Sequence, residues 1–200
     1  FGGLASLLVG WADFQFNGAN PAVNPYFYKT ATILAILIGG LTFTGSIYAW
    51  GKLSGKISGK AKTFAGQKAV NATIAALCLI SSVAFIVLGN YDAAYACMIA
   101  GVVLSLALGF AAVMPIGGGD MPVVISLLNS FSGLAASAAG FVIQNNVLIV
   151  AGCLVGASGV ILSVIMCKAM NRTLYNVLFS GFGATASKTG EVKGEMKAIS

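Results

Sequence analysis

The sequence of 200 residues contains no histidine and few charged residues, and these shortages exclude several classes of protein. Only 8% of the residues are charged, whereas soluble domains average about 25%. With 58% hydrophobic residues and a mean hydropathy of +0.93, the composition is that of a multi-span membrane protein. A metal site and a disulfide framework are not indicated, because the cysteines lack CxxC spacing and lie in or beside apolar runs: Cys78, Cys97, Cys153 and Cys167.

The formal net charge of +6 does not indicate a nucleic-acid partner. The cations lie in short loops between apolar runs and are not interleaved with aromatic residues, as they would be on a nucleic-acid surface. This distribution is typical of the positive-inside rule of membrane proteins.

Long apolar runs are what the sequence does contain. Each of five runs is about 20 residues long, which is enough to cross a bilayer as a helix: residues 30–50, 69–89, 93–116, 121–142 and 147–167. A sixth run, "FGGLASLLVGW" at Phe1, is too short to span, so we interpret the chain as part of a longer protein. The sequence therefore predicts an all-α, polytopic transmembrane helix bundle with one partial and five full spans.

The lysines predict the orientation of the bundle. The loop 51–68 and the tail from Lys168 are both rich in cations, and four spans separate them, so both are expected on the inner side. The short "GGGD" loop then also lies inside. The tail becomes polar after Phe182, and we predict a transmembrane domain over 1–182 and, over 183–200, either a linker to another domain or a free tail.

The sequence also predicts an internal repeat. "FGGLASLLVGW" at Phe1 matches "FSGLAASAAGF" at Phe131, and "LIGGLTFTGSI" at Leu37 matches "LVGASGVILSV" at Leu154. An even number of spans separates the two helix pairs, so both pairs run in the same direction. Repeats of this kind are common in transporters, where the functional site lies at the repeat interface.

Small and polar residues collect on the last two runs. Gly152 and Gly156 share one face of the run 147–167, which predicts close helix packing. Asn129 has two readings: a hydrogen bond that joins helices, or a polar group on a path for water or protons. Asp120 is placed as an N-cap for the helix that follows. The "IGGGDMP" loop lacks the GxxxxGK[ST] pattern, so it is not a nucleotide site.

Three stretches resemble one family specifically. "GGGDMPVVISLLNSFSG", "LIVAGCLVGASGVILSVIMCKAMNR" and "GLTFTGSIYAWGKLSGKISGK" are similar to the beta-subunit membrane domain of the proton-translocating NAD(P) transhydrogenases. The resemblance implies an enzyme that couples hydride transfer between NADH and NADP to proton translocation. NAD(H) and NADP(H) would be bound by neighbouring soluble domains, and this chain would hold no cofactor, no metal and no catalytic residue of hydride transfer.

The resemblance also implies roles for individual residues. The proton path would include Ser46, Asn129, Ser158 and Ser163. Asp120 and Arg172 would communicate with the NADP(H) domain, while Gly152 and Gly156 would pack helices. A membrane histidine of bacterial relatives would lie just before Phe1, and Ala157 stands where some relatives have serine.

The partners implied are lipid, an NADP(H)-binding domain after the tail, an NAD(H)-binding alpha part and a second copy, which would make the whole enzyme a dimer. The location would be the mitochondrial inner membrane or the bacterial plasma membrane. Two other functions stay open on the residues alone: a multi-span solute transporter, and a passive membrane anchor for soluble enzymes. A Rossmann GxGxxG sequence downstream of Ser200 would favour the transhydrogenase over the transporter.

Overall fold

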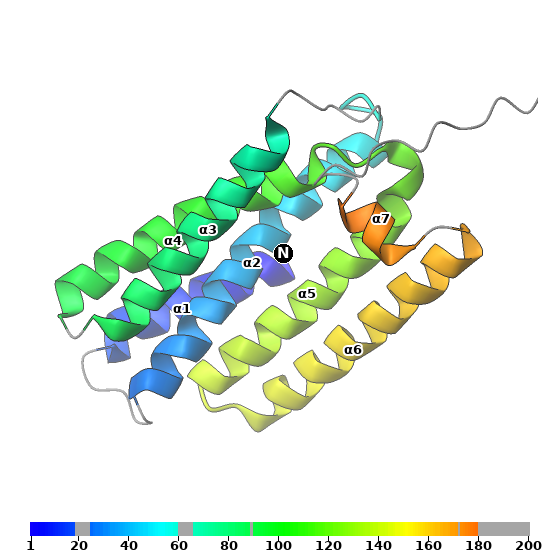
Figure 1. Ribbon diagram of the computed structural model, residues 1–200. Helices are drawn as coiled ribbons and strands as arrows, with labels where there is room; N and C mark the ends of the chain where they lie inside the picture. Colours follow the sequence, from blue (N-terminus) through cyan, green and yellow to red (C-terminus); the bar gives the residue numbers. More distant parts are fainter. Residues whose placement is uncertain (19–24, 60–65, 89, 172, 180–200) are drawn as a thin grey trace, which may run out of the picture.

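A computed structural model describes residues 1–18, 25–59, 66–88, 90–171 and 173–179 (Figure 1). These residues form helices and contain no strand, which confirms the predicted all-α fold. The helices are α1 (Gly2–Asn17), α2 (Pro25–Leu53), α3 (Gln67–Val87), α4 (Tyr91–Val113), the 3₁₀ turn η1 (Gly118–Asp120), α5 (Met121–Val142), α6 (Asn146–Ala169) and α7 (Leu174–Phe179).

The five predicted spans are confirmed as α2 to α6, each long and apolar enough to cross a membrane. The C-terminus of α4 lies three residues before its predicted position, at Val113 rather than Ile116. Pro115 has no N–H to donate to an intrahelical hydrogen bond, so the helix does not continue through it. α2 is longer than expected and continues through the beginning of the predicted lysine loop.

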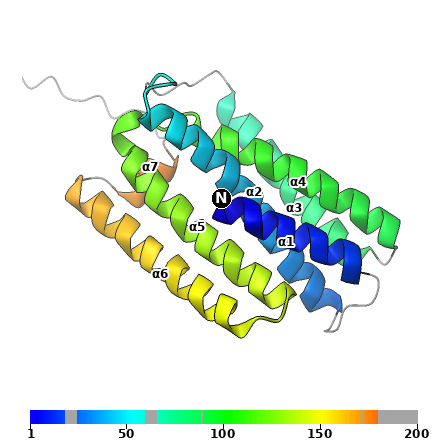
Figure 2. The same ribbon diagram turned by 180° about the vertical axis from the view of Figure 1, so that it is seen from behind.

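α2 lies at the centre of the bundle. It packs against α1, α4 and α5, and more loosely against α3. α3 pairs with α4 on one side of α2, and α6 pairs with α5 on the other side (Figure 1). Seen from behind, α1 lies across α2 between α4 and α5 (Figure 2). α2 is therefore the element that every other part of the bundle is built around.

α1 covers only one half of the length of α2. A Cβ placed on Gly3 would lie 2.7 Å from the carbonyl oxygen of Gly39, in the middle of α2. From there α1 runs antiparallel to α2, and Phe14 and Tyr28 belong to one buried cluster near its end. The half of α2 that ends at Leu53 is not covered by α1.

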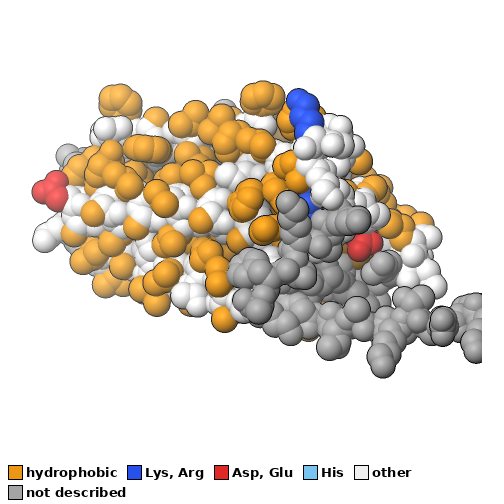
Figure 3. Space-filling model, turned by 90° about the horizontal axis from the view of Figure 1, so that it is seen from above, with side chains coloured by type: hydrophobic (Ala, Val, Ile, Leu, Met, Phe, Trp, Pro, Cys, Tyr) orange, Lys and Arg blue, Asp and Glu red, His pale blue; other side chains and the backbone are white. Residues whose placement is uncertain are grey.

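Charged side chains gather at the two ends of the bundle, and the flank between them is hydrophobic (Figure 3). The lysine end, as we call it, contains Lys52, Lys56 and Lys168 at or beyond the C-termini of α2 and α6. The Asp13 end contains Asp13 and Lys29, with Asp92 in the first turn of α4. This arrangement is that of a membrane protein, whose apolar belt separates two polar ends.

The two helix pairs of the predicted repeat meet at corresponding glycines. A Cβ on Gly133 of α5 would lie 2.6 Å from the nitrogen of Gly156 of α6, and in the sequence match these residues correspond to Gly3 and Gly39. Both pairs thus make their close approach at the same positions. These contacts are consistent with the repeat, which stays a prediction.

Candidate functional site

The interface between α5 and α6 is formed by residues without large side chains. A Cβ on Gly152 would lie 2.5 Å from the backbone nitrogen of Ser137, and one on Gly159 would lie 2.9 Å from the Cα of Ser130. A real Cβ does not fit at such distances, so the two backbones touch along this line. Gly152 and Gly156 both lie in this contact, where the sequence pattern predicted close packing.

Serine hydroxyls cross the same interface and pair with the opposite backbone. Ser130 Oγ donates to the carbonyl of Gly156 at 2.5 Å, and Ser126 Oγ reaches that of Gly159 at 3.4 Å. Ser163 has an exposed fraction of 0% and donates to Ser126 Oγ at 3.1 Å. Ser163 therefore lies in a chain of hydroxyls between the helices, close to the lysine end.

Asn129 and Ser46 lie at one level of the bundle. A Cβ on Gly45 would lie 3.2 Å from the side chain of Leu128. Ser46 and Asn129 are the next residues on these two helices, α2 and α5, so they lie at nearly the same height along the bundle axis. Both side chains are exposed, and neither makes a hydrogen bond to another described residue. Among the described residues Asn129 therefore does not make the interhelical hydrogen bond of its first reading, and its place on a path for water or protons stays a prediction.

Ser46 and Asn129 continue the surfaces of α2 and α5 that α1 contacts. Ser46 follows Gly39 by seven residues, so it continues the line on α2 that α1 contacts. Asn129 precedes Ser132 by three residues on α5, and Ser132 is the neighbour of Gly2. Both residues thus lie in line with the surface that α2 and α5 share with α1. The sequence could not show this, because it depends on how α1 is placed along α2.

Ser158 lies apart from these groups. It is exposed on α6, and its hydroxyl donates to the Val155 carbonyl of the same helix at 3.1 Å. The structure thus brings Ser46 and Asn129 to one level and places Ser163 between α5 and α6, but it does not bring Ser158 to either.

Lys52 is a residue of the lysine end whose position the sequence did not predict. Only 4% of its surface is exposed, and its Nζ donates to the carbonyls of Met114 at 2.6 Å and Ile116 at 2.8 Å. These acceptors follow the C-terminus of α4, where the helix dipole favours a cation. Its Nζ also lies 5.0 Å from the ring centre of Tyr48, four residues earlier. Residues four apart share a helix face, so a predicted helix that continued past residue 50 would have placed Lys52 beside Tyr48.

The loops at the lysine end are joined to one another. The amide of Gly118 donates to the carbonyl of Gly59 at 2.8 Å, which links the α4–α5 loop to the loop after α2. Ile57 and Val177 pack with Ile116 in one hydrophobic cluster, which adds α7 to the same assembly. These loops and α7 therefore form one packed assembly next to the start of α5.

Asp120 occupies the N-cap position of α5, as predicted, but its side chain makes no capping hydrogen bond. The 3₁₀ turn η1 gives Asp120 φ −92° and ψ −2°, whereas a capping residue is usually extended. In addition, Pro122 has no N–H at the second helical position. The carboxylate is thus not used for capping. Arg172, its predicted partner in communication, lies outside the described residues.

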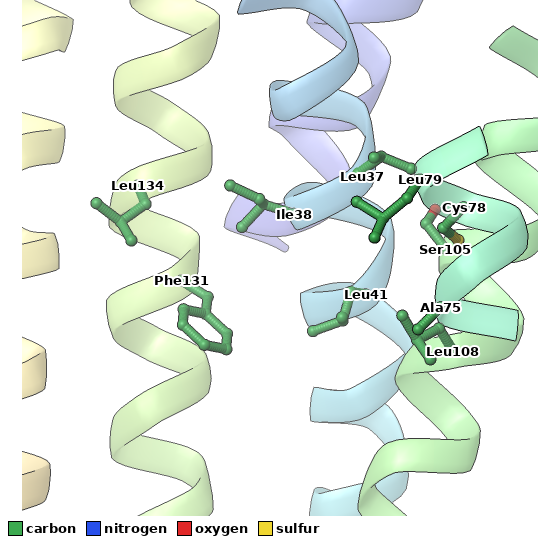
Figure 4. Close-up of a pocket in the computed structure, with 10 residues that line it drawn as sticks. All are labelled: Leu37, Ile38, Leu41, Ala75, Cys78, Leu79, Ser105, Leu108, Phe131 and Leu134. Atoms are coloured by element: carbon green, nitrogen blue, oxygen red, sulfur yellow. The ribbon is translucent and has the colours of Figure 1, made fainter. Parts of the chain in front are cut away.

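An apolar groove opens between α2, α3, α4 and α5, with a volume of about 370 Å³ (Figure 4). Phe131 and Leu134 of α5 form one side, and Leu79 of α3 lies on the opposite side. The hydroxyl of Ser105, which also lines it, donates to the Val102 carbonyl. The groove is suited to hydrocarbon and offers no station for a proton.

The described part of the chain contains no group of three or more side chains that could hold a metal ion. The four cysteines are free thiols, and Cys153 Sγ lies 3.1 Å from Ser137 Oγ across the α5–α6 interface. Polar chemistry in the described bundle therefore rests on hydroxyls, amides and a few charges at the two ends.

Comparisons with known proteins agree with one another. A family model described as NAD(P) transhydrogenase beta subunit matches residues 1–200. Two curated relatives from Rhodospirillum rubrum, both named NAD(P) transhydrogenase subunit beta, are each 50% identical over 151 residues, or 76% of this chain. The matched part is 32% of each relative, so the chain spans about a third of the length of the curated relatives it matches.

Proposed function

Because the chain belongs to the NAD(P) transhydrogenase beta-subunit family, we propose that it is the proton-conducting membrane part of an enzyme that couples hydride transfer between NADH and NADP to proton translocation. The observation that carries this proposal is that the whole chain matches the family and folds into apolar helices of membrane-spanning length. Hydride transfer would then take place in other parts of the enzyme, which bind NAD(H) and NADP(H).

The proton path would run along the surface that contains Ser46 and Asn129. Neither side chain titrates near neutral pH, so both would act by holding water molecules through hydrogen bonds. Both are exposed in this chain, and the relatives are much longer, so other helices of the whole protein would cover them and add further polar groups. Ser163 and Ser158 would join the path only if water reaches α6, which makes them the weaker members of the set.

Coupling to the NADP(H) domain would take place at the lysine end. Lys52 holds the carbonyls that precede η1, and Asp120 is the acid at the start of α5. We propose that the state of the NADP(H) domain is sensed by this loop, together with Arg172, and passed to α5 and hence to Asn129. Residues 183–200, outside the described residues, would be the linker to that domain.

The test is proton uptake and hydride transfer, measured on one preparation of proteoliposomes that contain the full-length protein with its NAD(H)-binding partner. Asn129→Leu removes the amide with little change in volume. We expect this variant to assemble, to lose proton uptake and the coupled hydride transfer, and to keep the hydride exchange that needs no proton step.

The matched control is Thr73→Val, which also replaces an exposed polar side chain on a spanning helix, α3. It should pump as the wild type does. Wild-type pumping by Asn129→Leu would remove Asn129 from the path. A wild-type enzyme that transfers hydride but moves no protons would contradict the proposed function itself and favour the passive anchor.

A further inference from the structure

The Asp13 end contains a carboxylate that is held by two neutral donors. Tyr28 OH donates to Asp13 Oδ2 at 2.6 Å, and Asn17 Nδ2 donates to Asp13 Oδ1 at 2.8 Å. Tyr28 is buried, with 3% of its surface exposed, while Asp13 is half-buried. The carboxylate thus has access to water on one side and contacts a buried hydroxyl on the other.

The cations and ionisable groups around Asp13 do not neutralise it. Lys29, next to Tyr28, donates from Nζ to the Leu88 carbonyl at 2.6 Å, at the C-terminus of α3. Tyr91 of α4 stacks on Phe14 with ring centres 5.5 Å apart and directs its hydroxyl to a backbone carbonyl of α1. Among the described residues Asp13 forms no ion pair, and the donors that hold it are the neutral side chains of Tyr28 and Asn17.

Aromatic residues place this carboxylate at the level of the membrane surface. Phe14 packs on Phe85 and Tyr91, and Tyr91 stacks with Tyr95. Phe14 and Phe85 are buried in the core, whereas Tyr91 is 39% exposed, and tyrosines are enriched at the boundary between the hydrocarbon and the aqueous phase. Asp13 is therefore at one of the two polar ends of the bundle, beside a partly exposed tyrosine.

The face of α1 that contains Asp13 is directed toward α5. Gly2, Ser6, Val9 and Asp13 follow the spacing of one helical face, and Gly2 lies near Ser132 of α5. Ser6 is buried on this face. Asp13 and Gly2 thus lie on one face of α1, and Gly2 is the end of this face that is near Ser132 and Asn129 of α5.

A dry layer separates the two parts of this face. Val9 packs against Ala35 of α2 and Ala138 and Ala139 of α5, with Asp13 on one side of the layer and Ser6 on the other. The side chains of this layer are small and apolar, but the buried hydroxyl of Thr32, three residues before Ala35, lies beside Tyr28. Asp13 therefore contacts the interior of the bundle through Tyr28, whose carbonyl accepts from the buried Thr32 hydroxyl.

We propose that Asp13, together with Tyr28, is the site at which the bundle exchanges protons with the aqueous phase at the end opposite to the lysine end. The inference rests on the proposed function, because it names the terminal station of the same proton path. A proton from water binds a carboxylate oxygen of Asp13 as an O–H bond, and the same bond breaks on release. The Tyr28 hydroxyl stays intact, since it can donate to the carboxylate and accept from the carboxylic acid.

The experiment uses full-length enzyme in proteoliposomes and compares Asp13→Asn, Asp13→Glu and Asp92→Asn. Asn keeps an oxygen that can accept from Tyr28 but cannot bind the proton. We expect Asp13→Asn to slow proton translocation on the order of a hundredfold and to flatten its dependence on the pH of the compartment at this end. Asp13→Glu should restore much of the rate, and the exchange that needs no proton step should be unchanged in each variant.

Asp92→Asn is the matched control, because Asp92 is an exposed acid at the same end. It should pump at the wild-type rate. Wild-type pumping and pH dependence in Asp13→Asn would overturn the proposal. So would an equal loss of pumping and of proton-independent exchange in both Asn and Glu variants, because that result describes a structural role. A wild type that does not pump would instead overturn the proposed function.

Discussion

The burial of Lys52 makes the clearest prediction about the lysine end. Lys52→Met keeps the length and apolar stem of the side chain but removes the ammonium that holds the Met114 and Ile116 carbonyls. Each hydrogen bond to a charged group contributes about 1.5–3 kcal/mol, and both carbonyls would lose this charged partner. Met is spared the desolvation of a buried ammonium, which offsets part of the loss. We expect the link between α4 and α5 to lose about 3 kcal/mol.

The assay is hydrogen–deuterium exchange of the amides that this link protects. The amides of Met114 and Ile116 donate within the end of α4, and the amide of Gly118 donates to Gly59. A loss of about 3 kcal/mol in local stability corresponds to roughly a hundredfold faster exchange where opening is local. Lys52→Arg keeps a cation and should accelerate exchange less.

Lys56→Met is the matched control for the loss of a lysine. Lys56 is exposed, and its Nζ lies 4.5 Å from the ring centre of Trp50, a contact worth less than about 1 kcal/mol. Its removal should leave the exchange of the α4–α5 loop unchanged. If Lys52→Met exchanged as slowly as Lys56→Met, the carbonyl contacts would not be what stabilises this loop, and the reasoning would be refuted.

Two further predictions concern packing and orientation. In Gly133→Ala the new Cβ would lie 2.6 Å from a backbone nitrogen of α6, so the variant should separate α5 from α6 and lower the yield of folded protein. The control Gly101→Ala, whose Cβ would lie 3.4 Å from its nearest neighbour, should be tolerated. Equal thermal stability of the two variants in detergent would contradict the close contact of α5 and α6. In a variant without native cysteines, Ser54→Cys and Met170→Cys should react with an impermeant thiol reagent from one side of the membrane and Asn90→Cys from the other. Labelling of Ser54→Cys and Met170→Cys from opposite sides would disprove the orientation.

The sequence by itself determined the helices, the close packing of one of them and the family to which the chain belongs. Runs of about 20 apolar residues have few stable alternatives to a helix in a bilayer, because unpaired backbone groups are costly there, so five spans could be predicted from hydropathy alone. The glycines of α6 predicted close packing for a similar reason, since a face without side chains leaves the backbone itself as the contact surface. The specific strings around Asp120 and Arg172 pointed to the family.

Only the tertiary structure decided which polar groups meet. Lys52 looked like one of several loop cations, and its burial depends on where α4 ends relative to α2. Asn129 and Ser46 are far apart in the sequence, and they come to one level of the bundle because of how α2 and α5 pack against each other. Asp13 and Tyr28 are 15 residues apart, and nothing in their spacing shows that their side chains share a hydrogen bond. Hydropathy reports the affinity of a segment for lipid, but the axial offset and rotation of packed helices depend on contacts between segments, and that information is distributed over all of them.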